Sequence, residues 1–302
     1  MTGLYSMIKR NTKLFFKDKG MFFTSLITPV ILLVLYATFL FKVYKDAFVS
    51  SLPNGLEFDE RLINGAVGGQ LLSSLLAVCC ITVAFCSNML MVNDKVSGAN
   101  KDIAMTPIKR STLSFSYYVS TVISTLLICL LALIAGMIYL GYVGWYLSAW
   151  DIIALIFDVF LLVLFGTALS SIVNVFLSTQ GQISTVGTIV SSGYGFICGA
   201  YMPISQFNEG LQNIISFLPG TYGTVLLRKH AIRGAFDAML EQNIPVEVVE
   251  SFKDAVDCNL YVLDKSVSIG VMYTVLVGST VALMGIYVFI NSVLFKKREF
   301  NK

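Results

Sequence analysis

Asp158 is the residue of this sequence with the clearest capacity for chemistry, because it is an acid inside a long apolar stretch. It follows Asp151 by seven positions, so on a helix the two carboxylates share nearly the same face, with Asp158 about 10 Å deeper. A carboxylate near the middle of a bilayer costs at least about 2.5 kcal/mol and therefore needs a partner or water. Three interpretations stay open: a role in a transport path or in proton binding, a structural hydrogen bond, or a membrane span that begins later than drawn.

The other reactive side chains predict no catalytic or metal centre. His230 is the only histidine, and its neighbours Arg228 and Lys229 favour a place at the membrane interface. Five of the six cysteines lie in apolar stretches, and Cys258 has no second cysteine near it outside them. Without a C-x-x-C pair or a histidine cluster, the sequence predicts neither a zinc site, nor a His-dependent nucleophile, nor a disulfide framework.

The sequence also lacks the G-x-x-x-x-G-K-[ST] motif, whose backbone cradles the phosphates of ATP. We therefore expect no enzyme activity, no cofactor and no metal on this chain, and ATP and Mg²⁺ would be bound by a partner. No feature predicts binding to nucleic acid. Any work driven by ATP would have to be done by a separate P-loop ATPase subunit.

Composition places these residues in a membrane protein. Of 302 residues, 56% are hydrophobic and 13% are charged, against about a quarter charged in soluble proteins, and the mean hydropathy is +0.78. A helix that crosses about 30 Å of hydrocarbon needs roughly 20 apolar residues. The predicted fold class is an all-α membrane protein with six transmembrane helices, at residues 20–41, 62–93, 113–140, 151–177, 183–203 and 267–295.

The charge distribution predicts the orientation of these helices, because Lys and Arg are retained on the cytoplasmic side. Basic residues gather in the N-terminal segment, in a charged island near residues 94–110, and in the tail, residues 296–302. Both termini are therefore expected in the cytoplasm of a multi-pass plasma-membrane protein. Residues 204–228 and 229–265 are expected outside, the latter as an extracellular cap, before the last membrane segment at 266–295.

The N-terminal segment, residues 1–19, has the pattern of an amphipathic helix that lies in the plane of the lipid headgroups. Leu4, Ile8 and Phe15 share one face. The opposite face carries Lys9, Arg10, Lys13 and Lys17. We expect this helix to contact a partner as well as lipid. The alternative is a basic flank that does no more than retain positive charge inside.

The charged island, "DKVSGANKDIAMTPIKR" (residues 94–110), predicts a short helix between two spans. Gly98 supplies a turn, Asn100 an N-cap, and Pro107 an end to a helix over residues 101–105. Ser111 is expected to cap the next span. A short, stiff helix between two long membrane helices can transmit a push. The alternative is a solvated turn that keeps lysines inside.

This arrangement resembles the permease subunit of type-2 ABC exporters. The resemblance covers nearly the whole chain and includes a first intracellular loop of the form acidic-K-x-x-G-x-x-x-[DE]-x-x-x-T-P-x-x-R. It implies that this loop is a coupling helix seated in a groove of a separate ATPase subunit. Asp94 and Asp102 stand where the family usually has Glu, and Asn100-Lys101 replaces a more apolar pair. The residues implied in coupling are Asp94, Lys95, Gly98, Lys101, Asp102, Thr106, Pro107 and Arg110.

Residues 199–228 are similar to the family's Pro-bounded hairpin, which dips into the outer leaflet as two short helices. Pro203 and Pro219 delimit segments too short to span the membrane. Arg228 is expected to snorkel to lipid headgroups. The predicted outer gate comprises Pro203, Glu209, Pro219 and Arg228, and the alternative is an ordinary amphipathic hairpin on the surface.

Glycines in the predicted fifth span, Gly195 and Gly199, stand in the G-x-x-x-G register that lets helices approach closely. Gly65 and Gly69 repeat the spacing in the second span. Packing within one subunit and a dimer interface or pathway both agree with this pattern. Together with Asp158, Gly195 and Gly199 are the candidate pathway residues.

The resemblance implies an ATP-driven exporter built from two permeases, as a homodimer or as a heterodimer with a relative, and two ATPase subunits. Its cargo would be a small amphiphilic substrate such as a drug, antibiotic, peptide or lipid. Two alternatives stay open: an exporter of lipid-linked polysaccharide with the same fold, and a membrane scaffold or sensor that moves no cargo. An ion-coupled carrier is disfavoured, because it should show several intramembrane ionisable groups and internal repeats.

Overall fold

The computed structural model describes residues 2–50, 59–262 and 265–299. Residue 1, residues 263–264 of the predicted cap and residues 300–302 of the predicted tail lie outside the described part. The first half of the chain forms α1 (Thr2–Lys17), α2 (Lys19–Leu35), the π-helical η1 (Tyr36–Leu40), α3 (Phe41–Ser50), α4 (Glu60–Val96), α5 (Ala99–Ala104) and α6 (Arg110–Val143). The second half forms α7 (Ala149–Phe176), α8 (Gln180–Ile197), the 3₁₀ turn η2 (Ile204–Gln206), α9 (Glu209–Ser216), α10 (Pro219–Glu241), α11 (Val246–Ala255), β1 (Tyr261–Val262), β2 (Lys265–Ser266) and α12 (Ile269–Glu299).

Within the described residues, five helices are long and apolar enough to cross a membrane: residues 19–46, 60–96, 111–143, 149–176 and 269–291. They confirm the all-α membrane fold and correspond to five of the six predicted spans. The predicted span at 183–203 corresponds to α8, which has 18 residues and is rich in glycine, serine and threonine. At 1.5 Å per residue α8 is about 27 Å long. It falls short of the other five in apolar character, so a sixth span stays a prediction.

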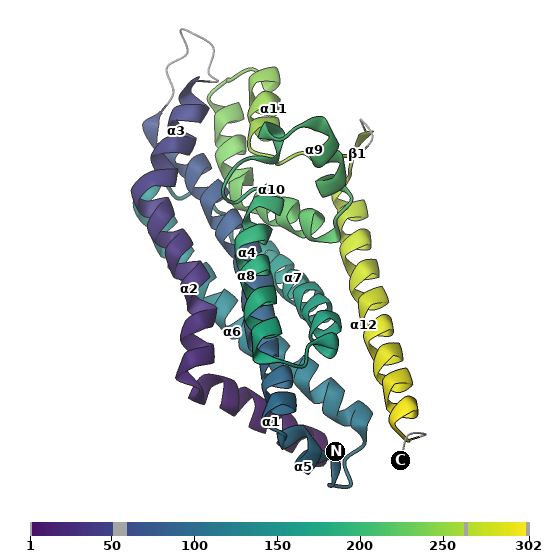
Figure 1. Ribbon diagram of the computed structural model, residues 1–302. Helices are drawn as coiled ribbons and strands as arrows, with labels where there is room; N and C mark the ends of the chain where they lie inside the picture. Colours follow the sequence, from purple (N-terminus) through teal and green to yellow (C-terminus); the bar gives the residue numbers. More distant parts are fainter. Residues whose placement is uncertain (1, 51–58, 263–264, 300–302) are drawn as a thin grey trace.

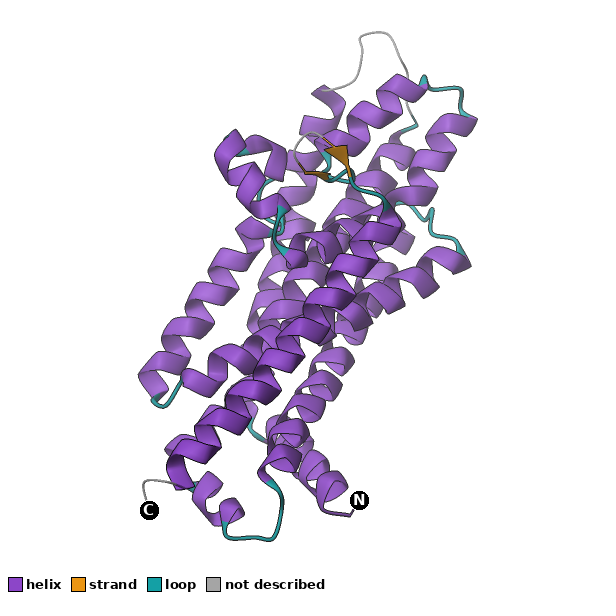
Figure 2. Cartoon of the chain, turned by 90° about the vertical axis from the view of Figure 1, so that its right-hand side faces the viewer, coloured by secondary structure: helices purple, strands orange, loops and turns teal. Residues whose placement is uncertain are grey.

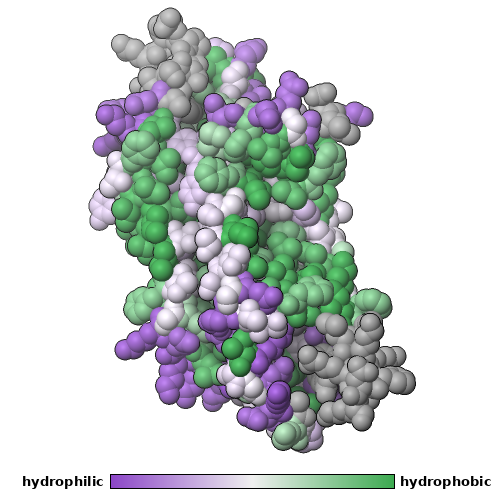
Figure 3. All heavy atoms as spheres, viewed as in Figure 1, coloured by the Kyte–Doolittle hydropathy of each residue, from purple (hydrophilic) through white to green (hydrophobic). Residues whose placement is uncertain are grey.

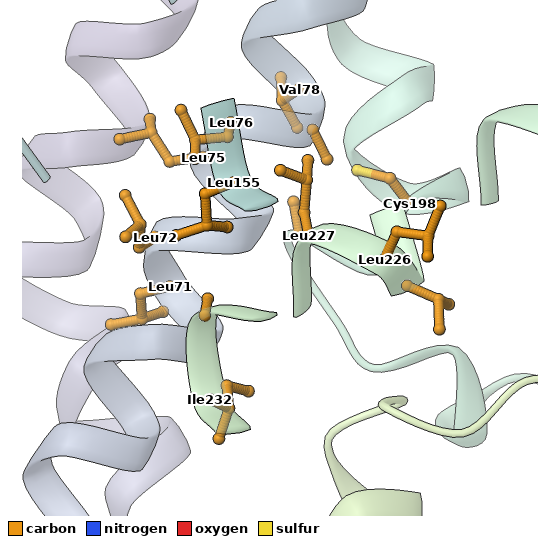
Figure 4. Close-up of a cluster of buried hydrophobic side chains, with 14 of the residues drawn as sticks. Leu71, Leu72, Leu75, Leu76, Val78, Leu155, Cys198, Leu226, Leu227 and Ile232 are labelled. Atoms are coloured by element: carbon orange, nitrogen blue, oxygen red, sulfur yellow. The ribbon is translucent and has the colours of Figure 1, made fainter. Parts of the chain in front are cut away.

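Helix α4 is the centre of the fold. It has 37 residues, 29 of them buried, and it packs against α2, α6, α7, α8 and α10 (Figure 1). Figure 4 shows Leu155 of α7 among the leucines of α4, and Leu226 of α10 beside Cys198; all belong to one buried cluster. Close approach depends on small residues, since a Cβ on Gly69 would lie 2.6 Å from the carbonyl oxygen of Ala231. Gly69 therefore serves packing within the subunit.

The two ends of the molecule differ in the elements that they carry. Helices α1 and α5 and the last turns of α12 lie at one end, while α9, α11 and β1 lie at the other (Figure 1). The antiparallel pair β1–β2 is drawn at that second end in a molecule that is otherwise helical (Figure 2). Hydrophilic side chains gather at both ends, with a mainly hydrophobic band between them (Figure 3). The three basic segments of the sequence therefore share one end, as predicted.

The segment after α8 differs from the predicted pair of short helices. Pro203 precedes η2 and Pro219 is the first residue of α10, so both prolines mark starts of elements as expected. However, α10 is 23 residues long and continues past residue 228 without a break. It packs against α4, α7 and α12 rather than forming part of a surface hairpin.

Candidate functional site

The charged island folds as predicted into a short helix, α5, in a loop that joins the two long helices α4 and α6. Gly98 precedes α5 with a φ of +83°, a left-handed conformation that glycine adopts without strain. It occupies the N-cap position that the sequence assigned to Asn100. The N-cap of α6 is Lys109 and not the predicted Ser111. Residues 97–109 are called the α5 loop below.

The outer surface of the α5 loop combines charged and apolar side chains. Lys101, Asp102, Thr106 and Pro107 are exposed, and Met105 is 86% exposed. The side chain of the predicted coupling residue Arg110 lies outside the described part. Methionine is enriched at surfaces that bind another protein, so the exposed Met105 is the member of this set that favours docking.

The inner surface of the same loop is packed. Ile103 of α5 and Ile108 lie against a buried cluster made by α1, α4 and α6. Its members are Met7, Leu90, Met91, Leu113 and Tyr117. The loop is therefore anchored to three helices through apolar contacts, so a displacement of α5 would reach all three.

Asp94 forms the first of two polar ties beneath the loop. It is buried and accepts hydrogen bonds from Arg10 Nη1 at 2.6 Å, from Arg10 Nη2 at 3.1 Å and from the Tyr117 hydroxyl. The hydrogen bond from Arg10 to Asp94 raises the pKa of Arg10. Two predictions need correction: Asp94 lies inside the subunit and not on the docking surface, and Arg10 is half-buried against Asp94 rather than on an exposed basic face with Lys9, Lys13 and Lys17. The sequence holds no signal for this pair, because the two residues are 84 positions apart.

Lys95 forms the second tie. Its ammonium donates to the carbonyl oxygens of Asn174 and Val175, each at 2.9 Å, and of Leu177 at 3.3 Å. These carbonyls end α7, where the helix dipole favours a cation. Lys95 therefore also points inward, against the prediction that it docks a partner. Lys95 thus joins the end of α4, directly before the loop, to α7.

Helix α1 is amphipathic, as predicted. Met7, Asn11 and Phe15 are buried against the bundle, while Lys9, Lys13 and Lys17 are exposed at four-residue spacing. An exposed lysine row suits anionic headgroups or a partner. The position of α1 in the headgroup plane stays a prediction.

A groove of about 490 Å³ lies between α2, α4 and α8. Asp18, which caps α2, Gln180, the first residue of α8, and Asn93, near the end of α4, place its mouth at the end that carries the α5 loop. One set of lining side chains carries hydroxyls: Thr24, Thr28, Ser184, Thr188 and Ser191. Another is apolar: Met21, Ile27, Met89 and Ile183. Among the described residues that line the groove, Asp18 is the only charged one.

The face of α8 beside this groove is polar for a helix at membrane depth. Gly181, Thr185, Thr188 and Ser192 are small, and all four are exposed. The hydroxyls of Thr185, Thr188 and Ser192 donate to carbonyls four residues earlier in α8, at 2.9, 2.9 and 2.6 Å. In Figure 3 a pale strip runs down the middle, where Figure 1 places α8. Small residues with satisfied hydroxyls are typical of a helix that packs against another helix or lines a pathway.

Arg228 contradicts its predicted place at the headgroups. The side chain is fully buried and pairs with Asp257 at 3.3 Å. It also donates to Ser74 Oγ and to the carbonyl oxygens of Cys198 and Gly199, at 3.3, 3.0 and 3.2 Å. Arg228 therefore joins α10 to α4, to the end of α8 and to the segment after α11. The sequence missed this because the partners come from three separate parts of the chain, near residues 74, 198–199 and 257.

Asp158 has two hydrogen-bond partners, as its burial requires. Its carboxylate lies 2.6 Å from Nδ1 of His230 on α10 and 2.7 Å from the hydroxyl of Tyr273 on α12. His230 is thus bound inside the bundle, with only 13% of its side chain exposed. Its place at the membrane interface stays a prediction. One turn along α10, Arg233 Nε lies 2.8 Å from Asp151. The available signal was limited to two acids on α7 and two bases on α10, because their spacings of seven and three residues do not match.

The remaining predicted residues lie apart from the groove. Gly195 packs against the ring of Tyr201, and a Cβ on Gly199 would lie 3.1 Å from Arg228. Glu209 is exposed in the first turn of α9. Neither glycine lines the groove, and neither does Asp158. Their roles in a pathway, and those of Pro203, Glu209 and Pro219 in a gate, stay predictions.

Comparison with known proteins gives one match. Residues 2–231 match the family model described as ABC-2 type transporter. This range covers most of the chain, from α1 into α10, and includes the α5 loop and the groove. No curated protein and no solved structure matches the chain.

Proposed function

Because the chain belongs to the ABC-2 type transporter family, we propose that it is the permease subunit of an ATP-driven exporter in the plasma membrane. A separate P-loop ATPase would bind the α5 loop from the cytoplasm. ATP binding would move the loop, and the permease would pass its cargo from the end that carries α5 toward the end that carries α9. The chain lacks an ATP-binding motif of its own.

The observation that carries this proposal is the construction of the α5 loop. Its outer side exposes charged and apolar groups, while Ile103 and Ile108 on its inner side pack against α1, α4 and α6. Directly before the loop, Asp94 and Lys95 at the end of α4 bind α1, α6 and α7. A solvated turn with no partner needs no such anchoring. A loop that is anchored in this way and has an exposed docking face can pass a displacement to α1, α4, α6 and α7, and α4 also lines the groove.

The groove between α2, α4 and α8 supports an amphiphilic cargo. Hydroxyls and apolar side chains share its lining, and its one charged residue is the acid Asp18. A lipid-linked polysaccharide carries phosphate, which proteins bind with Arg, Lys or helix N-termini. No basic side chain lines the groove, and the two helix N-termini that open onto it are already capped, that of α2 by the Asp18 carboxylate and that of α8 by Thr179 and Gln182. We therefore favour a neutral or cationic amphiphile over a phosphate-linked polysaccharide.

The polar face of α8 supports assembly of two permeases. Gly181, Thr185, Thr188 and Ser192 would be poorly matched to lipid but well suited to a second helix or a shared pathway. We therefore propose a dimer, with a second copy or with a related permease, in which the α8 faces meet beside the two grooves.

Reconstitution tests the proposal. The permease is placed in liposomes with the P-loop ATPase subunit proposed as its partner, and ATP hydrolysis and uptake of amphiphilic dyes are measured. Asp102→Ala or Pro107→Ala should leave hydrolysis measurable but lower dye transport about tenfold or more, because both residues lie on the exposed side of the α5 loop. Asp237→Ala, an exposed acid on α10, is the control and should transport normally. Normal transport by both loop variants would contradict the docking assignment, and absence of any stimulated hydrolysis by wild type would favour the scaffold.

A further inference from the structure

A second cavity lies at the end of the molecule opposite the α5 loop. It has a volume of about 230 Å³ and is enclosed by η2, α9, α10 and the segment from α11 to β1. Its floor is apolar: Ile204, Ile215, Val225 and Leu260. The volume is below the range of about 300–1,000 Å³ that is usual for drug-sized ligands, so it would hold a small molecule or one group of a larger one.

The hydroxyl groups that line this cavity have already donated their hydrogens to the protein. Ser216 donates to the carbonyl oxygen of Asn213 at 2.8 Å, and Thr221 donates to that of Ile215 at 2.7 Å. Tyr261 donates to Asp254 at 3.0 Å. A hydroxyl has one hydrogen, so each of these groups can offer a ligand only its oxygen lone pairs.

The lining amides are committed in the same way. Asn259 Nδ2 donates to Asp254 at 2.8 Å and to Glu250 at 3.3 Å. Gln212 Nε2 donates to the carbonyl oxygen of Phe207 at 2.7 Å. The polar wall of the cavity therefore presents mainly acceptors, so a ligand that binds there has to bring the donors.

Among the described residues that line the cavity, the charged ones are two carboxylates. Asp257 is compensated, because its Oδ2 accepts from Arg228 and from the Ile204 backbone N–H at 2.7 Å. Asp254 is different: its two hydrogen-bond donors, Asn259 and Tyr261, are neutral. A cationic donor at Asp254 would complete this acceptor-rich wall.

The cations near Asp254 are engaged elsewhere. Lys253 pairs with Glu250 at 2.8 Å, and this hydrogen bond lowers the pKa of Glu250. Lys229 donates to Asn259 Oδ1 at 3.2 Å. Neither lysine lines the cavity. The carboxylate of Asp254 is thus available to a ligand.

We propose that this cavity is a binding site for a small organic ammonium, with its apolar part on the Ile215 and Leu260 floor and its N–H groups directed to Asp254. The site goes beyond the proposed export function, because binding here needs neither ATP nor a partner subunit. If the proposed orientation is correct, the cavity faces the exterior and joins the predicted gate segment α9 to the cap.

Binding of three size-matched probes to the full-length protein in lipid nanodiscs tests the site. Benzylammonium, benzyl alcohol and benzoate share one ring and differ in charge, and empty nanodiscs correct for partition into lipid. Benzylammonium should bind saturably and about fivefold or more tightly than benzyl alcohol, because it adds one charged hydrogen bond. Benzoate should not bind, since it meets carboxylates and has no donor.

Variants locate the binding. Asp254→Asn should reduce the ratio of the affinities for benzylammonium and benzyl alcohol to nearly one. Glu247→Gln, two turns earlier on α11 and outside the cavity, should leave this ratio unchanged. Ile204→Trp should weaken both the ammonium and the alcohol by filling the floor. Equal affinity of wild type for ammonium and alcohol, lack of saturable binding, or an unchanged preference in Asp254→Asn would each overturn the proposal. The comparison of the three probes on the wild-type protein tests the proposal even if a variant does not fold. None of these outcomes depends on whether the protein transports a substrate.

Discussion

The charged side chains that the structure buries each lie against a partner. Asp94 pairs with Arg10, Asp151 with Arg233 and Arg228 with Asp257, while Asp158 is hydrogen-bonded to the imidazole of His230. In a medium of low dielectric an isolated charge costs several kcal/mol, so pairing is the condition for placing these groups inside. At the residue scale, the pairs also decide which segments are held together.

Arg228 provides the most direct test at this scale. Arg228→Met should lower the free energy of unfolding by about 3–5 kcal/mol, because it leaves Asp257 unpaired and frees the carbonyls of Cys198 and Gly199. Thermal unfolding in detergent measures the change. Lys253→Met, which removes a surface pair with Glu250, is the control and should cost less than about 1 kcal/mol. Similar losses of stability in the two variants would show that the buried contacts of Arg228 do not hold these segments together.

Sequence reasoning reached part of this residue-scale picture. It predicted that Asp158 needs a partner, because the cost of a buried carboxylate follows from position alone. It did not identify His230 as this partner, because His230 lies 72 positions away and helical periodicity relates residues only within one helix. The same limit explains why Asp94, Lys95 and Arg228 were expected at surfaces: charge alone favours exposure, and their partners come from distant segments.

At the scale of elements, the close contact between α4 and α10 depends on glycine. Gly69→Ala would place a Cβ 2.6 Å from the backbone oxygen of Ala231, so α10 would have to move. We expect a loss of about 1–3 kcal/mol in thermal unfolding. Gly193→Ala on α8 has no atom within 4 Å of the new Cβ and should leave stability unchanged or raise it by up to about 1 kcal/mol. Equal effects of the two substitutions would contradict this packing.

Elements were predicted well where length and hydropathy decide. Five spans, the turn before α7, the break between α7 and α8 and the short α5 follow from apolar run length and from Gly and Pro positions. Helix α10 was missed as a buried element, because Arg228, Lys229, His230 and Arg233 give it the composition of an exposed segment. Acids on α7 and after α11 compensate several of these bases, and no local pattern shows that.

At the scale of the whole molecule, the shared end of α1, α5 and α12 predicts a sidedness that labelling can check. Ser251→Cys on α11 should react with a membrane-impermeant maleimide on intact cells, while Met105→Cys should react only after permeabilisation. A Cys86→Ser background removes the one native cysteine that is not buried. Cys258 should not react with the maleimide, because burial raises the pKa of its thiol to about 12. The reverse pattern would invert the proposed direction of transport.

The two polar ties beneath the α5 loop differ in kind. Arg10 grips Asp94 with two parallel hydrogen bonds, a planar fork that holds one orientation, so α1 and the end of α4 turn as one body. Lys95 instead offers a rotating ammonium to three carbonyls, any of which it can release while keeping the others. The first contact fixes the orientation of the two helices that it joins, whereas the second allows them to rotate relative to each other. We therefore expect that a force applied to the loop would move α1 and α4 together, while α7 changes its angle to them.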